Sequence, residues 1–313
     1  MIYTSNAFVL PLPSGHRFPM AKYARLAERV TRLAGPLMHV PDAATDAELL
    51  RAHDAGYVDA VSRGTLDERA LQRIGFPWST AMVDRSRRST GATLAACRSA
   101  LDRGVGINLA GGTHHAHRAH GEGFCVFNDA AVAARAMQAE GLARRVLVVE
   151  LDVHQGDGTA AIFEGDTTVT TLSVHGRQNF PFRKRASAID VELDDGTTDD
   201  AYLATLATVL PRAIDRARPD LAVYLAGADP FEGDRLGRLK VTAAGLAERD
   251  RRVLAALRER GVPVALSMAG GYGRDIATTV DIQRRTLQEA LASWQGWRAA
   301  WLPWRRALGT AAR

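Results

Sequence analysis

The chain has 313 residues, of which 46% are hydrophobic, and a formal net charge of +5 at pH 7. This size allows one large α/β domain with a substantial core, whereas two cysteines, Cys97 and Cys125, exclude a disulfide framework and a cysteine-rich zinc site. No apolar run reaches the roughly 18 residues of a membrane span, and no secretory signal is recognisable, so we expect a cytoplasmic protein without a transmembrane segment.

Buried strands and amphipathic helices are expected to alternate along the chain. The strands are predicted at residues 105–109, 146–151, 169–174, 221–225 and 262–268, where β-branched residues and leucine form short runs. The helices are predicted at 128–140, 199–217, 243–260 and 278–294, and Pro211 is expected to kink or restart the second of them. This alternation predicts a single-domain α/β fold with a mostly parallel sheet and helices on both faces.

The arginines do not gather on one basic face. Arg249, Arg251 and Arg252 stand among Glu248 and Asp250, a pattern typical of a solvated helix surface. With so small a net charge, this interleaving argues against nucleic acid as a partner.

Unusual polar residues follow four of the predicted strands. In an open α/β sheet, functional groups gather outside the carboxyl ends of the strands. In chain order these positions hold His114 and His115 after two glycines, Asp152 and His154, Asp229, and Tyr272 after two glycines.

A metal site can be assembled from three of these residues. Asp152 and His154 are two positions apart on an extended segment, so their side chains point to the same side, and Asp229 can supply a third ligand. Two carboxylates and one imidazole leave room for water, as a catalytic zinc ion requires. An isolated Asp-x-His is more often a capped turn than a ligand pair, and the combination with Asp229 favours the metal site.

The histidine pair and the tyrosine have two interpretations each. His114 and His115 could serve as proton carriers beside the metal, or could be loop histidines that bind backbone groups. Tyr272 could donate its phenolic hydrogen to a polarised carbonyl, or could merely belong to a turn.

Seven segments, in this order, resemble the histone deacetylases and their bacterial relatives, which include acetylpolyamine hydrolases and acetoin-utilisation proteins. They are residues 73–79, 89–91, 111–116, 123–129, 152–159, 227–229 and 270–272. The His-Gln pair at 154–155 and residues 232–237 are similar to the class IV branch and its bacterial members.

The resemblance implies the arginase–deacetylase fold and a zinc ion, with Fe²⁺ as an alternative, on the Asp152, His154 and Asp229 set. It also implies roles for the residues around that ion. His115 would be the general base and then the acid, Asp157 would orient it, His114 would be a second, electrostatic histidine, and Tyr272 would stabilise the oxyanion.

A substrate channel is implied as well, flanked by Phe124 and Phe180 and lined by Gly123 and Gly270. The resemblance also implies a potassium site involving Glu150 and Ser173. Glu150 departs from the family pattern there, because relatives usually carry an aspartate that orients the first histidine and helps to bind the potassium ion, and the extra methylene changes both interactions. The loop after Phe180 carries three basic residues, Arg183, Lys184 and Arg185, which either form a basic channel rim that repels polycations or are solvated away from it.

The expected activity is removal of an acyl group, acetyl or longer, from an acylated lysine in a protein or peptide. The main alternative is an amidohydrolase acting on small acylated amines such as acetylpolyamines. An inactive acyl-lysine-binding module would lack His115 or Tyr272, and an arginase-like enzyme would need further carboxylates for a second metal ion.

The C-terminal segment, residues 294–313, is expected to dock on the catalytic domain, residues 1–293. Its tryptophans, Trp294, Trp297, Trp301 and Trp304, are spaced to share one helical face. The alternatives are a homo-oligomer interface or contact with an anionic membrane surface.

Overall fold

The computed structural model describes the backbone of residues 1–310 and the side chains of residues 1–299. Within this part of the chain, one parallel sheet has eight strands in the order β2-β1-β3-β8-β7-β4-β5-β6. Their bounds are β1 Ile2–Tyr3, β2 Met38–His39, β3 Val105–Asn108, β4 Val146–Glu150, β5 Val169–Gly176, β6 Ile189–Leu193, β7 Leu221–Leu225 and β8 Val264–Ser267. The parallel α/β architecture predicted from the sequence is confirmed.

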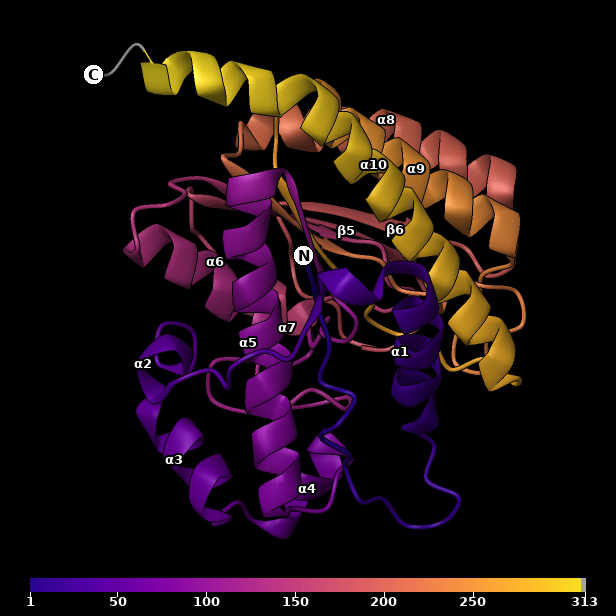
Figure 1. Ribbon diagram of the computed structural model, residues 1–313. Helices are drawn as coiled ribbons and strands as arrows, with labels where there is room; N and C mark the ends of the chain where they lie inside the picture. The colour runs from indigo at the N-terminus through magenta and orange to yellow at the C-terminus, as the bar shows by residue number, and fades with distance from the viewer. Residues whose placement is uncertain (311–313) are drawn as a thin grey trace.

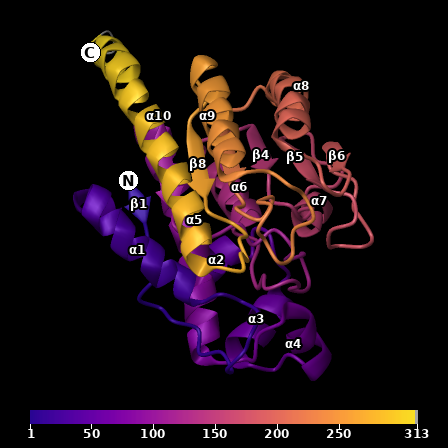
Figure 2. The ribbon, with the colours of Figure 1, turned by 90° about the vertical axis from the view of Figure 1, so that its right-hand side faces the viewer.

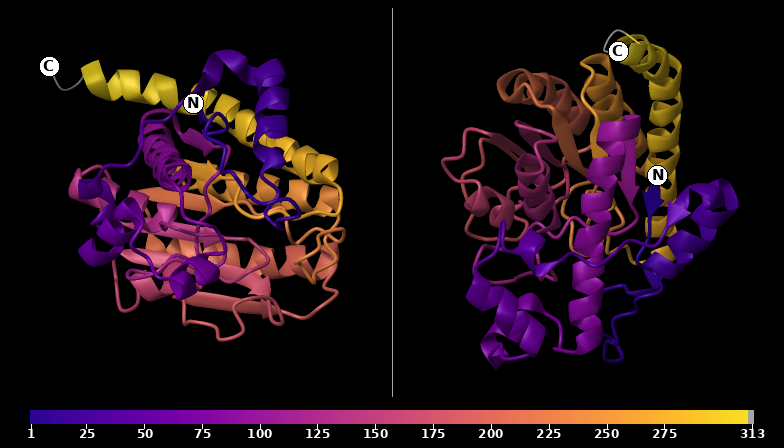
Figure 3. Two further views of the ribbon diagram at one scale, coloured as in Figure 1. Left: turned by 90° about the horizontal axis from the view of Figure 1, so that it is seen from below. Right: turned by 60° about the vertical axis from the view of Figure 1, so that its left-hand side comes forward.

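Helices cover both faces of the sheet. They are α1 Ala21–Ala34, α2 Asp46–Leu49, α3 Ala55–Arg63, α4 Glu68–Ile74, α5 Thr80–Arg103, α6 Asp129–Ala139, α7 Asp157–Ile162, α8 Asp199–Ala217, α9 Ala243–Glu259 and α10 Ile276–Thr310. Helices α8, α9 and α10 lie side by side (Figures 1 and 2), and α5 and α6 pack together in a separate layer. The end of α10 projects beyond the rest of the molecule when it is viewed from below (Figure 3, left).

The alternation of side chains along the central strands builds two cores. In β4, Leu147 and Val149 join a cluster with residues of α1, α8, α9 and α10, while Val146 and Val148 join a second cluster with residues of α3, α5 and α6. Successive side chains of a strand point to opposite faces, so a strand buried on both sides reads as a continuous apolar run. That is why the central strands are recognisable in the sequence.

Helix α8 runs through Pro211 as one continuous helix, so the expected restart does not occur. Pro211 removes a single backbone donor, and the buried face of α8, which includes Leu206 and Leu210, packs on the sheet core on either side of it. None of the described helices is long and apolar enough to cross a membrane.

Helix α10 continues across the predicted boundary at residue 293. Trp294 packs against the core and Trp297 is 3% exposed within it. The Trp297 ring lies so close to Gly104, whose φ is +86°, that a Cβ there would meet it at 2.5 Å. The side chains of Trp301 and Trp304 lie outside the described residues.

Candidate active site

The strand order brings the predicted site segments to one edge of the sheet. Strand β7 lies between β4 and β8, with Leu225 paired to Glu150 on one side and to Ser267 on the other. The three strands therefore end side by side, and the segments that follow them begin at the same edge of the sheet. They carry Asp152 and His154, then Asp229, then Tyr272.

Asp152, His154 and Asp229 meet at a buried point. His154 Nδ1 lies 2.9 Å from Asp152 Oδ1 and 3.3 Å from Asp229 Oδ2. The outer carboxylate oxygens are held by backbone: Gly270 N–H donates to Asp152 Oδ2 at 2.9 Å, and Val153 N–H donates to Asp229 Oδ1 at 2.9 Å. Asp229 Oδ2 is buried and has no hydrogen-bond partner. Asp152 Oδ1 also accepts the backbone N–H of His154 at 3.0 Å. One ligand atom of each of the three side chains lies within 4.8 Å of the other two, close enough to share an ion.

The electrostatics of this group favour a cation at its centre. Burial lowers the pKa of His154, but the carboxylates of Asp152 and Asp229 outweigh burial and raise it to about 10. Burial, together with the charge of Asp152, raises the pKa of Asp229 to about 7. Both shifts are upward: without a metal ion, this buried cluster of two carboxylates retains protons, whose positive charge a bound cation would replace. Neighbouring ligands of a tetrahedral ion with bonds of about 2.0–2.2 Å lie about 3.3–3.6 Å apart. The separation of His154 Nδ1 from Asp229 Oδ2 fits this range, and that from Asp152 Oδ1 is shorter.

The glycines around the centre make room for its carboxylates. A Cβ on Gly270 would stand 2.0 Å from Asp229 Oδ2 and 2.5 Å from Asp152 Oδ2. No larger residue could occupy this position without displacing the carboxylates. Gly270, predicted as a channel residue, therefore borders the candidate metal centre formed by Asp152, His154 and Asp229 directly.

His115 is oriented by a buried aspartate. Its Nδ1 donates to Asp157 Oδ1 at 2.6 Å, and His117 Nε2 lies 3.1 Å from Asp157 Oδ2. Burial raises the pKa of Asp157, but the hydrogen bonds to these two histidines outweigh burial and hold it below its usual range. With Nδ1 engaged, Nε2 of His115 is the nitrogen that can accept a proton. His117 is a partner of Asp157 that the sequence alone did not suggest.

His114 stands beside His115, with ring centroids 4.2 Å apart. Its Nε2 lies 3.9 Å from Asp152 Oδ1, and its Nδ1 lies 4.0 Å from Glu150 Oε2 without a hydrogen-bond partner. Burial and the neighbouring His115 lower the pKa of His114 to about 3. His114 is therefore close to the metal centre but is not locked as His115 is.

The carboxylate of Glu150 lies against the backbone of Gly156. A Cβ on Gly156 would meet Glu150 Oε2 at 1.7 Å, so the longer side chain fits only because residue 156 has none. Burial raises the pKa of Glu150 to about 8, although the hydroxyl of Thr159 opposes the shift. Ser173 is the register partner of Glu150 on β5, and its hydroxyl lies 2.9 Å from His175 Nδ1. A potassium ion at this place stays a prediction.

Tyr272 faces the same centre and is only 9% exposed. Its backbone N–H donates to Asp234 Oδ2 at 2.6 Å, and its ring centroid lies 6.3 Å from that of His154. Burial raises the pKa of its hydroxyl well above the usual range, so Tyr272 keeps its proton. Lys22, buried on α1, donates to the carbonyls of Ala269 and Gly271 and so fixes the loop that carries the tyrosine.

The Gly-Gly-Thr-His-His loop is clamped by Asp129. Its carboxylate accepts the N–H groups of Gly112 and Thr113 and the hydroxyls of Thr93 and Thr113. Gly111 and Gly112 have φ of +77° and +73°, a backbone conformation that favours glycine. Asp129, the first residue of α6, belongs to a segment that the resemblance identified, but its role required the fold.

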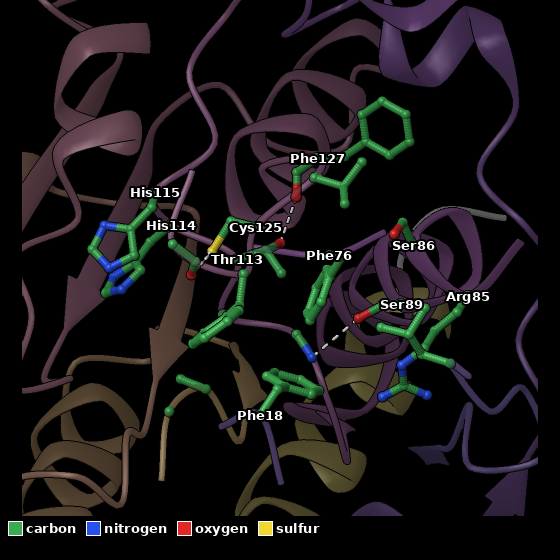
Figure 4. A pocket seen from close by; sticks show the side chains of 18 of the residues that line it. Phe18, Phe76, Arg85, Ser86, Ser89, Thr113, His114, His115, Cys125 and Phe127 are labelled. Atoms are coloured by element: carbon green, nitrogen blue, oxygen red, sulfur yellow. Dashed lines mark hydrogen bonds between the residues drawn. The ribbon is translucent and has the colours of Figure 1, made fainter. Parts of the chain in front are cut away.

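A cavity adjoins the candidate metal centre, and Asp152 and His154 are among the residues that line it (Figure 4). His114 and His115 stand at one end, and Phe18, Phe76 and Phe127 line its apolar wall together with the basic residues Lys22 and Arg85. The guanidinium of Arg85 donates to the carbonyls of Ser5 and Phe8.

A second cavity opens to the surface and forms the channel. His115, His154 and Tyr272 lie at its inner end, and its lining includes Gly123, Phe124 and Phe180, the residues expected along a substrate channel; their role there stays a prediction. The Phe180 ring packs edge-on against His115 at a centroid distance of 4.9 Å. Phe124 reaches its position with a φ of +67°.

The three basic residues of the loop after Phe180 do not line the channel rim. The ammonium of Lys184 donates to the carbonyls of Arg177, Asn179 and Pro181, so it holds the loop together instead of facing a substrate. Arg183 and Arg185 do not line the channel. The three backbone carbonyls point towards the inside of this loop and need hydrogen-bond donors, and the ammonium group of a lysine carries three N–H donors.

Arg249, expected on a solvated helix face, is fully buried. Its Nη1 donates to the carbonyls of Leu151 and Gly227, which flank the metal ligands, and its Nε donates to Asp250 Oδ1 at 2.8 Å. Arg251 and Arg252 do pair with Glu248 near the surface. Adjacent positions of α9 point in different directions, and charge interleaving alone cannot tell which one turns inward.

Comparisons with known proteins agree with this geometry. Residues 16–283 match the model of the histone deacetylase domain. The chain is 44% identical over 273 residues to an uncharacterized protein of Picosynechococcus sp., covering 86% of this chain and 91% of that protein. It is 30% identical over 294 residues to histone deacetylase 2 of Arabidopsis thaliana, covering 90% and 76% of the two chains.

Two solved structures share the fold. The crystal structure of the HDA15 HD domain has a TM-score of 0.73 at 24% identity and covers 96% of each chain. That of a histone deacetylase homologue from Aquifex aeolicus has a TM-score of 0.77 at 22% identity and covers 94% of this chain and 88% of the other. The match over most of its length shows that this chain belongs to the histone deacetylase family.

Proposed function

We propose that this protein is a zinc-dependent amide hydrolase that removes an acyl group, acetyl or longer, from an acylated lysine. The observation that carries this proposal is the convergence of three kinds of group at the inner end of one channel. A metal-ligand set, a histidine locked on a buried aspartate, and a protonated tyrosine all border the same point.

Asp152, His154 and Asp229 would hold the ion. When bound, zinc supplies Lewis-acid polarisation of the acyl carbonyl and activates water for attack. His115, whose Nδ1 is fixed by Asp157, takes a proton from the attacking water at Nε2 and later gives it to the departing amine as the amide C–N bond breaks. The proton that His115 gains in the first half of the reaction is therefore lost in the second.

Tyr272 would stabilise the carbonyl oxygen as negative charge develops on it. Its hydroxyl is protonated at neutral pH because burial raises its pKa, so it can donate a hydrogen bond. Asp234 and Lys22 hold its backbone from two sides and keep the donor in place. The aromatic walls of Phe124 and Phe180 would exclude water from the aliphatic stem of the lysine.

Turnover of Nε-acyl-lysine peptides of increasing acyl length, with and without a chelator, tests this proposal. We expect release of the carboxylic acid and the free lysine, abolished by the chelator and restored by zinc. No cleavage of any acyl-lysine peptide by the zinc-loaded protein, with cleavage of acetylpolyamines instead, would move the assignment to small acylated amines.

A further inference from the structure

The mouth of the channel is basic, through residues outside the loop after Phe180. Arg17 precedes α1, Arg73 lies in the last turn of α4, and Arg238 lies in the segment between β7 and α9. All three are exposed and line the same opening. Among the described residues that line it, Glu122 is the one carboxylate apart from the buried catalytic centre.

Two of these arginines have no acidic partner in the described part of the chain. The side chains of Arg17 and Arg73 make no ion pair or side-chain hydrogen bond there, whereas Arg238 pairs with Asp195 at 3.1 Å. Glu122 forms no ion pair with Arg17 or Arg73 in that part of the chain, and its carboxylate lies 3.9 Å from His120 Nε2. Elsewhere exposed arginines are commonly paired, as Arg98 is with Glu48 and Glu140.

We propose that this mouth selects acylated amines that carry a carboxylate close to the acylated lysine, such as an acyl-lysine flanked by acidic residues in a peptide. The inference rests on the proposed deacylase function and names its substrate class. Guanidinium groups bind carboxylates through paired hydrogen bonds. A concave opening lined by positive charge also focuses the electrostatic field and so attracts anionic substrates. The same field repels polyamines and lysine-rich peptides.

The side chains around the arginines suit a peptide segment. Phe182, at 82% exposure, stands at the opening with its ring centroid 6.2 Å from that of Phe180. Arg235 is tied by its Nε to the carbonyl of Tyr272 at 2.9 Å and links this rim to the catalytic loop. An acyl-lysine stem in the channel would therefore leave its neighbouring residues at the arginines.

Three peptides test the proposal on the zinc-loaded protein. Each has a central Nε-acetyl-lysine flanked on both sides by two aspartates, two alanines or two lysines. We expect kcat/KM to fall in that order, with the aspartate peptide favoured over the lysine peptide by about tenfold at low salt, and the ratio to shrink towards one at 1 M NaCl, where charges are screened within about 3 Å. Nα-blocked Nε-acetyl-lysine with a free carboxylate shows whether one carboxylate on the lysine itself suffices.

The double variant Arg17→Gln/Arg73→Gln should lower the aspartate-to-lysine ratio by about twofold to tenfold, because two exposed ion pairs account for a factor of about 2 to 30 and the ratio itself is about tenfold. Arg183→Gln is the matched control, because Arg183 is exposed and does not line the channel. A lysine peptide cleaved as well as the aspartate peptide, or a ratio that the double variant does not change, would overturn the inference while leaving the proposed function intact. If none of the three peptides is cleaved, the proposed function fails, and the inference fails with it.

Discussion

Replacing Asp250 by asparagine should destabilise the protein and loosen the metal centre together. Asp250 is fully buried and is the counter-ion of Arg249. It also accepts the hydroxyls of Tyr224, at 2.5 Å, and Thr286, at 2.6 Å. Removing one partner of a buried pair costs about 3–5 kcal/mol, because the other charge is left without compensation.

For a chain of this length the entropy of unfolding is about 0.7 kcal/mol per degree, so the loss corresponds to a Tm about 4–7 °C lower. Arg249 also holds the carbonyls of Leu151 and Gly227, next to the metal ligands, at 3.1 and 2.6 Å. Disturbing such outer contacts typically weakens metal binding by about 10–100-fold.

Thermal unfolding followed by circular dichroism and zinc content after dialysis measure the two effects. Glu28→Gln is the control, since Glu28 forms an exposed pair with Arg32 and should shift Tm by less than about 1 °C. An Asp250→Asn protein with the Tm and zinc content of the parent would refute the account of Arg249 and Asp250.

The other predictions concern the reacting groups and one buried histidine. Tyr272→Phe should lower kcat by about 10²–10³ with zinc retained, because the variant loses one hydrogen-bond donor to the oxyanion. Steady-state kinetics and metal analysis measure both quantities, and an unchanged kcat would mean that Tyr272 has only a structural role. His115→Ala should lower kcat by about 10²–10⁴ and by more than His114→Ala, and the reverse order in the same assay would exchange their roles. Burial lowers the pKa of His53 from its ordinary 6.5 to about 4. Between these two pH values the unfolded chain binds a proton at this histidine and the folded protein does not, so the free energy of unfolding falls as the pH drops from 6.5 to 4. His53→Asn should remove up to about 1.4 kcal/mol per pH unit of that loss. Urea unfolding of both proteins at pH 7 and pH 5 measures how the free energy of unfolding changes with pH, and an equal change in the variant and the parent would contradict this prediction.

The sequence predicted the centre of the fold well because buried parallel strands are continuous apolar runs. Strand β7 has the predicted bounds, and β4 and β8 differ from prediction only at their ends. Strands β1 and β2 have two residues each and carry no periodic signal. Strand β6, at the edge, alternates buried and half-exposed residues with exposed ones and lacks the apolar run of its neighbours.

The candidate site was predictable where its side chains follow strands directly, as Asp152, His154 and Asp229 do. Residues that act on the site through tertiary contacts were not predictable from the sequence. His117 shares Asp157 with His115, and Arg249 reaches the carbonyls beside the metal ligands from α9. Such contacts join segments distant in sequence, and no local pattern distinguishes a buried arginine from its exposed neighbours.

Zinc titration of metal-free protein, followed by turnover of an Nε-acetyl-lysine peptide, tests the central claim most directly. Turnover should be absent in the metal-free protein, rise to a plateau at one zinc ion per chain, and stay absent in Asp229→Ala under the same conditions. Full turnover without metal, or an Asp229→Ala protein restored by one equivalent of zinc, would contradict the account.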